Sequence, residues 1–235
     1  MRGRNFVLLS LMLCACIIVI AGCSKEKLEE KVKLDLPEEE LELIYTEEES
    51  EELVGISSLQ RGEWRSFAVY VDNGYFRNNF IPSGWMGDYG DMKFNPNWKD
   101  NVHSRKSCIR IEYTAEAKQG NRWAGIYWQN PENNWGMREG GGFDLEKAAK
   151  LTFWARGEKG GEAIREFKMG GISGAYPDTD TASIGPVTLT QEWQQYTIDL
   201  TELDLSYIIG GFAWVASALD NPDGMVFYLD DIIYE

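Results

Sequence analysis

Histidine and internal cysteine are nearly missing from this sequence of 235 residues, and that scarcity narrows the chemistry open to it. His103 is the only histidine and lies in a polar stretch, so a histidine-based catalytic triad has no credible second element. No cluster of histidines and cysteines could hold zinc. Three of the four cysteines, Cys14, Cys16 and Cys23, lie near the start. Cys108 is the one cysteine outside this N-terminal segment. The apolar residues around it in the sequence predict a small core residue without a disulfide partner.

Basic side chains are also in short supply. Lys and Arg number 23 against 38 Asp and Glu, which gives a formal net charge of −15. A chain this acidic lacks the basic surface that binds phosphate backbones, so we expect no nucleic-acid partner. The glycines 140–142 lack the Lys-Ser/Thr of a phosphate-binding loop. Acids abound, and two carboxylates suffice for glycoside hydrolysis, but no pair is marked by its context. We therefore predict a protein that is not an enzyme.

Residues 1–22 have the pattern of a secretory signal peptide. Two arginines precede an apolar run over residues 6–20, which is short for a membrane span of about 20 residues. The sequence Ile-Ala-Gly-Cys at 20–23 resembles a bacterial lipobox, with Ile20 where that pattern prefers Leu. The resemblance implies a lipoprotein that is cleaved before Cys23 and anchored in a lipid bilayer by acylation of that residue. The alternative is an ordinary secretory signal with an incidental cysteine.

An acidic segment follows the signal. Residues 24–52 hold 13 acidic and 4 basic side chains, and like charges repel one another and extend a chain. Pro37 interrupts any long helix. We therefore expect residues 23–64 to be a disordered tether. Ser24 stands where an Asp is linked with inner-membrane retention, so the resemblance implies the cell envelope, and the outer membrane in a cell with two.

Residues 65–235 read as one β-rich domain. Short segments rich in Val, Ile, Tyr, Phe, Trp and Thr alternate with Gly, Pro, Asn and Asp, which is typical of strands and turns. Only Leu145–Lys150 looks helical, for about one turn. The pattern predicts an all-β fold, an antiparallel β-sandwich or jelly roll. The eight predicted strands are Phe67–Asp72, Ser107–Tyr113, Arg122–Gln129, Lys150–Arg156, Glu166–Gly170, Trp193–Leu200, Ile208–Val215 and Val226–Tyr234.

Four segments resemble the galactose-binding-like jelly rolls, which include many carbohydrate-binding modules. The closing strand reads Phe-Tyr-Leu-Asp-Asp-Ile at 227–232, and the opening reads Val-Tyr-Val-Asp-Asn-Gly at 69–74. Phe-Asp-Leu at 143–145 followed by the Phe-Trp strand at 151–157, and Trp-x-x-Tyr-x-Ile-x-Leu at 193–200, also match. The resemblance implies the same fold and binding of a polysaccharide or oligosaccharide, although one fold hosts many functions.

The same resemblance implies a structural calcium ion near the first and last strands. Asp230 matches the usual position best, and Asp72 is a possible partner. Oxygen ligands of this kind suit calcium. The alternative is that Asp230 caps a turn or accepts hydrogen bonds from backbone amides.

Period-two alternation separates core rings from candidate ligand-binding rings. Along Arg122–Gln129, Ala, Ile and Trp alternate with Trp123, Tyr127 and Gln129, so the second set is predicted to face outward. In the strand at 151–156, Trp154 and Arg156 face outward by the same argument. We expect these five side chains to form one solvent-facing surface on neighbouring strands, where rings flanked by amide and guanidinium groups would suit a sugar. Alternatively, the rings pack under loops.

Two tryptophans in turn-rich segments are predicted to form a binding rim. Trp85 lies in the segment 82–89 and Trp135 in the segment 130–136, both read as loops. For Trp135 the alternative is a lid that seals the end of the sandwich. Trp193 opens an alternating strand and reads as structural.

Together these patterns predict non-catalytic glycan binding by a lipid-anchored domain. The first alternative is a structural or protein-interaction domain, for which a flatter and more aliphatic surface would be expected. The second is a small glycan-cleaving enzyme, which requires two carboxylates facing each other across a cleft.

Overall fold

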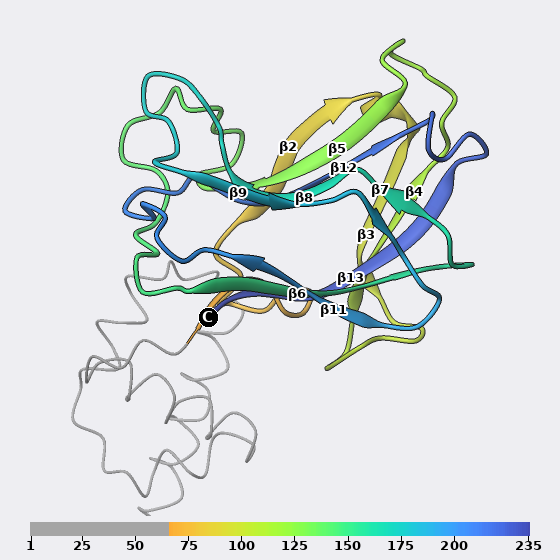
Figure 1. The fold of residues 1–235 in the computed structure, drawn as a ribbon, viewed down its shortest axis with the longest axis horizontal. Helices are drawn as coiled ribbons and strands as arrows, with labels where there is room; N and C mark the ends of the chain where they lie inside the picture. The colour runs from red at the N-terminus through yellow and green to blue at the C-terminus, as the bar shows by residue number, and fades with distance from the viewer. Residues whose placement is uncertain (1–65) are drawn as a thin grey trace, which may run out of the picture. The chain divides into compact units, whose positions relative to one another are not determined.

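Two antiparallel β-sheets dominate the computed structural model, which describes residues 66–235 (Figure 1). Sheet A has the strand order β11–β6–β13–β4–β3, with β1 also paired to β13, and sheet B has the order β2–β5–β12–β8–β9. A separate short pair joins β7 and β10. The strands are β1 Phe67–Tyr70, β2 Ile81–Gly87, β3 Met92–Trp98, β4 Cys108–Tyr113, β5 Trp123–Gln129, β6 Lys150–Gly157, β7 Ala163–Ile164, β8 Glu166–Gly170, β9 Thr181–Ile184, β10 Val187–Thr188, β11 Gln194–Asp199, β12 Gly210–Ser217 and β13 Met225–Tyr234. The predicted all-β antiparallel sandwich is confirmed.

The core lies between the two sheets and follows the predicted alternation. The inward residues of the central strands β5 and β12, among them Ile126, Phe212 and Trp214, are fully buried, and most of the outward residues of these two strands are buried as well. Phe153 of sheet A packs against Phe167 and Phe212 of sheet B, with ring centroids 4.7 and 5.1 Å apart. Each such ring contributes about 1.5–3 kcal/mol by leaving water. The interleaved aromatic rings therefore hold the two sheets together.

All eight predicted strands are present, but two further long strands were missed. β2 covers most of the segment 82–89 that we expected to be a loop, and β3 was not expected at all. Both lie at sheet edges, where proline is tolerated because the outer N–H groups need no partner. Pro82 and Pro96, with neighbouring Gly and Asn, hid the strand signal.

The short helix predicted at Leu145–Lys150 is wrong, because this segment makes a turn at 146–147 and enters β6 at Lys150. Its backbone groups bond to distant segments. The Leu145 amide donates to the Leu205 carbonyl at 2.9 Å, and the Lys150 amide donates to the Glu235 carbonyl at 3.0 Å. Tertiary partners thus replace the bonds that a helix would make within itself.

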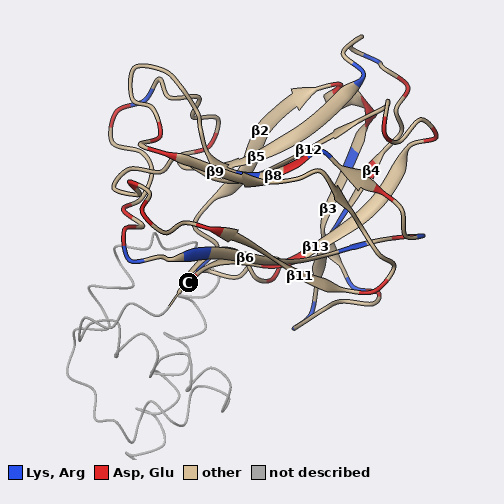
Figure 2. Cartoon of the chain, viewed as in Figure 1, with Lys and Arg blue, Asp and Glu red and all other residues tan. Residues whose placement is uncertain are grey.

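The two ends of the described chain meet on sheet A. β1 pairs with the last strand, β13, so that Phe67 lies opposite Tyr234. Two loops, 130–142 and 171–180, stand beyond sheet B at one end of the sandwich (Figure 1). Acidic residues are found in loops at both ends (Figure 2).

The signal peptide, the acylation of Cys23 and the tether at 23–64 fall among residues 1–65, outside the described residues. Within residues 66–235, no helix has the length and apolarity needed to span a membrane.

Candidate functional site

The five outward-facing residues predicted to share one surface lie on two different sheets. Trp123, Tyr127 and Gln129 belong to β5 in sheet B, whereas Trp154 and Arg156 belong to β6 in sheet A. The prediction of a single surface on neighbouring strands is therefore wrong. Alternation indicates which side of a strand faces the core, but not in which sheet that strand lies.

On sheet B, the outer face is built around Tyr127. Its register neighbours are Gly84 on β2 and Ala213 on β12, so little side-chain bulk flanks the ring. The hydroxyl donates to the Gly170 carbonyl at 2.9 Å, and burial raises the pKa of this phenol well above its usual value. Tyr127 is 7% exposed. The Tyr127 ring is therefore a rigid support on which other side chains pack, and not a freely exposed ring.

Trp135 packs against the Tyr127 ring and is 40% exposed. The ring centroids of Trp135 and Tyr127 are 6.0 Å apart, with an interplanar angle of 83°. The Lys168 ammonium lies 5.9 Å from the centroid of the Tyr127 ring. The accessible indole of Trp135 is thus held edge to face against the buried phenol ring of Tyr127, and the Lys168 ammonium lies beside that phenol ring.

Gln129 positions the Trp135 loop instead of facing solvent. Its side chain is fully buried, which contradicts the predicted outward exposure. Its amide nitrogen donates to the Asn134 carbonyl at 2.9 Å, and its oxygen accepts from the Ser83 hydroxyl at 2.9 Å. A backbone hydrogen bond also joins the loop 130–142 to the loop 171–180, because the Tyr176 amide donates to the Gly136 carbonyl at 2.8 Å.

Half-buried residues extend this surface across the sheet. Trp123 on β5, Met86 on β2 and Val215 on β12 share the outward face, and β8 adds Glu166 and Lys168. A hollow of about 340 Å³ lies beside Glu166 and Val215, lined also by residues of β9. We call this surface the sheet B platform, and it consists of Met86, Trp123, Tyr127, Trp135, Glu166, Lys168 and Val215.

Trp85 lies apart from the platform. It is opposite Ile126 in the β2–β5 register, so it projects to the core side at the edge of sheet B. Its ring packs edge to face against Phe94 at 6.0 Å, and it is 39% exposed. Trp85 therefore covers the gap between the sheets at this edge.

On sheet A, the outer face carries Trp154 and Arg156 beneath the loop that joins β3 to β4. His103 of that loop stacks on Trp154 with centroids 3.8 Å apart. The Arg156 guanidinium is 3.8 Å from the Tyr228 ring centroid and 5.4 Å from that of Trp193, and the residue is 6% exposed. Arg156 is therefore not the solvent-facing group that we predicted, whereas Trp154 is half-buried beneath His103.

Asp230, the predicted calcium ligand, is fully buried on β13. Its carboxylate accepts hydrogen bonds from the backbone amides of His103, Ser104 and Asp231 at 3.2, 3.2 and 2.9 Å. Burial, together with the neighbouring charge of Asp231, raises the pKa of Asp230 to about 7. The alternative to calcium binding is that Asp230 accepts hydrogen bonds from backbone amides, and these three contacts are of that kind.

Calcium itself stays a prediction. Asp72 accepts from the Ser107 hydroxyl and from the Asn73 amide. Within residues 66–235, one group of three or more potential metal ligands converges at Asp230, and its other members are His103 and Asp231, not Asp72. Ca²⁺ prefers six to eight oxygen ligands, so a set that includes an imidazole suits it poorly.

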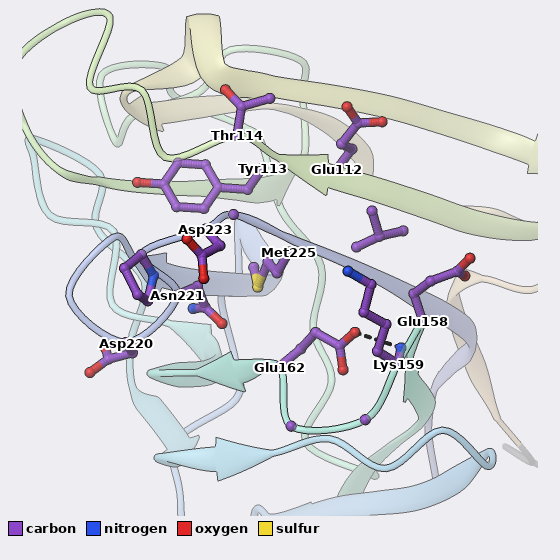
Figure 3. Close-up of a pocket in the computed structure, with 15 residues that line it drawn as sticks. Glu112, Tyr113, Thr114, Glu158, Lys159, Glu162, Asp220, Asn221, Asp223 and Met225 are labelled. Carbon is purple, nitrogen blue, oxygen red and sulfur yellow. Dashed lines mark hydrogen bonds between the residues drawn. The ribbon is translucent and has the colours of Figure 1, made fainter.

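A larger pocket of about 470 Å³ opens at the end of the sandwich, between the loops 158–162 and 220–224 (Figure 3). Its carboxylates are mostly engaged, because Glu112 pairs with Lys93 and Arg110, Glu158 accepts from Tyr228, and Asp220 pairs with Arg165. Its one aromatic ring, that of Tyr113, is 1% exposed. The pocket therefore offers no ring on which a ligand could stack.

Comparison with known proteins gives a structural likeness only. No protein-family model matches the chain, and no curated protein sequence does. A crystal structure of a family 30 carbohydrate-binding module is similar at a TM-score of 0.50 and 17% identity, covering 73% of this chain and 88% of that one. The family 30 module of a cellulosomal cellulase of Clostridium thermocellum gives 0.49 and 16%, covering 73% and 98%. A mutant family 29 module gives 0.42 and 11%, covering 73% and 92%. At such identities the likeness, carried by the first structure, concerns the fold.

Proposed function

We propose that this protein binds a glycan without catalysis, through the sheet B platform. The observation that carries the proposal is the exposed Trp135 indole, held over Tyr127 beside Lys168. A sugar ring can stack its C–H face on such an indole, while its hydroxyl groups exchange hydrogen bonds with Lys168 and Glu166. The shared fold with a structure described as a carbohydrate-binding module supports this reading.

The remaining parts of the proposal derive from the sequence. Acylation of Cys23 would hold the platform at the bacterial cell envelope, and the acidic segment would act as the spacer. Glu166 is the one carboxylate in the platform as defined, and two opposed carboxylates are needed for glycoside cleavage. This favours binding over hydrolysis.

Affinity electrophoresis against a panel of polysaccharides tests the proposal. Trp135→Ala should weaken retention of the protein by at least about tenfold, since truncating a central aromatic anchor commonly costs 2 kcal/mol or more. Trp85→Ala is the matched control, because this tryptophan is equally exposed but lies off the platform. Its retention should equal that of the unmodified protein.

Two other results would redirect the assignment. If Trp154→Ala weakens retention while Trp135→Ala does not, the glycan binds on sheet A. If no polysaccharide retains the unmodified protein, the platform is better explained as a protein-binding surface, for which Met86, Val215 and the exposed Met137 would supply aliphatic contacts.

A further inference from the structure

Consecutive carboxylates point to the same side of β13, which a regular strand would not allow. In a regular strand, Asp230 and Asp231 would project to opposite faces. Here the pairing of β13 with β6 shifts register after Asp230, and Asp231 adopts a φ of 44°. The ligand atoms of both carboxylates and of His103 consequently lie within 4.8 Å of one another.

The imidazole of His103 is held in place for this cluster. Stacking on Trp154 fixes the plane of the ring, and the Trp193 indole N–H donates to the Asn101 carbonyl of the same loop at 3.0 Å. His103 Nδ1 lies 3.1 Å from an Asp231 carboxylate oxygen. Two donors bound to one Zn²⁺ at about 2.0–2.2 Å are about 2.8–3.5 Å apart at right-angled to tetrahedral geometry.

The local charge also favours a cation. Asp230 is fully buried and the Asp231 side chain is 16% exposed. No lysine or arginine among residues 66–235 forms an ion pair with either carboxylate, and His103 lies within ion-pair distance of Asp231. Two adjacent, largely buried carboxylates that no lysine or arginine pairs are costly.

We propose that His103, Asp230 and Asp231 bind a divalent transition-metal ion of the zinc type, instead of the calcium ion that the fold resemblance implies. One imidazole and two carboxylates are a donor set that suits Zn²⁺, whereas Ca²⁺ prefers six to eight oxygen ligands and the imidazole offers only nitrogen. The ion would fasten the loop containing His103 to β13. Its role would be structural and separate from the sheet B platform.

Zinc titration followed by NMR tests this directly, because the chain has a single histidine and so gives a single set of imidazole signals. Zn²⁺ should shift the His103 signals to saturation. It should also raise the melting temperature by roughly 5–10 °C at free zinc a hundredfold above its dissociation constant. Ca²⁺ at the same concentrations should change neither.

Two variants and one control locate the site. His103→Phe keeps a ring to stack on Trp154 but removes the nitrogen donor, and Asp231→Asn keeps the side-chain shape. Both should lose the thermal shift. Asp223→Asn changes the net charge equally at an exposed position and should keep it.

Several outcomes would overturn the assignment. They are His103 signals that zinc leaves unmoved, zinc stabilisation that persists in His103→Phe, and an equal response to calcium. The NMR result on the unmodified protein stands even if a variant fails to fold. Because Trp135→Ala should leave the zinc response intact, failure of the glycan proposal would not affect this one.

Discussion

The thiol of Cys108 lies on β4 with no exposed surface, and it illustrates how packing alters a single residue. Burial, with a further contribution from the nearby Asp230 charge, raises the pKa of this thiol to about 12. The thiolate is the reactive form, so its population at pH 8 is far below that of a free cysteine.

We therefore expect Cys108 to resist alkylation in the native protein. Iodoacetamide at pH 8 should leave the peptide that contains Cys108 unmodified, whereas the same treatment in denaturant should label it fully, as measured by peptide mass spectrometry. Rapid labelling of the folded protein would show that β4 opens or that the thiol is accessible.

Asp88 acts at the level of secondary-structure elements, since it ties the end of β2 to the segment before β5. Burial opposes ionisation of this carboxyl. The backbone amides of Asn121, Arg122 and Gln119 nevertheless donate to it at 2.9, 2.5 and 3.0 Å, and together they lower its pKa below the ordinary aspartate value. The ionised form is thus favoured in the folded state.

The lowered pKa fixes the sign of a pH effect. Asp88 stabilises the fold at pH values above the ordinary aspartate pKa of about 3.9, and this contribution is lost as the pH falls through the lowered pKa. Asp88→Asn should lower the melting temperature at pH 7 by several degrees, because a hydrogen bond to a charged group is worth about 1.5–3 kcal/mol. Calorimetry should show the deficit shrinking below pH 4. A deficit independent of pH would contradict this account.

Gly136 sets the contact between the two loops beside the platform. Its φ is 76°, and an added Cβ would lie 2.3 Å from the Ser173 carbonyl oxygen. Gly136→Ala should therefore separate the loops, displace the adjacent Trp135, and reduce polysaccharide retention in the same gels severalfold.

Gly140 provides the control for that substitution. It lies in the same loop with a similar φ of 74°, but an added Cβ meets no atom within 4 Å. Gly140→Ala should carry the backbone strain alone, of order 1 kcal/mol, and keep its retention. Equal losses in the two variants would mean that strain, not the loop contact, positions Trp135.

The elements also show where inference from sequence succeeds. Strands such as β5, β6 and β13 were predicted because their core faces are continuous runs of apolar residues. The edge strands β2 and β3 carry Pro, Gly and Asn, which read as turns until their pairing partners are known. Glu166 and Lys168 could have been predicted to face away from the core, because they alternate with the buried Phe167 and Met169, but not to lie on the platform.

At the scale of the whole molecule, the sequence pattern could not predict which sheet each strand joins or which side chains the loops cover. Alternation correctly turned Tyr127 and Trp154 away from the core, but the assignment of β5 and β6 to different sheets depends on long-range pairing. Only tertiary contacts show that His103 covers Trp154 and that Gln129 holds the Trp135 loop. Trp135 and Tyr127 were thus identified as candidates individually, and their edge-to-face pairing comes from the fold.

The pairing of β1 with β13 has a practical consequence for the whole domain. Both strands belong to sheet A, so the backbone enters at residue 66 and leaves at residue 235 on the sheet opposite the platform. A bead, a biosensor chip or a fused reporter attached at residue 66 or at residue 235 would therefore be joined to sheet A. The aromatic face would then remain turned toward the surrounding solution, ready to meet even a bulky polymer.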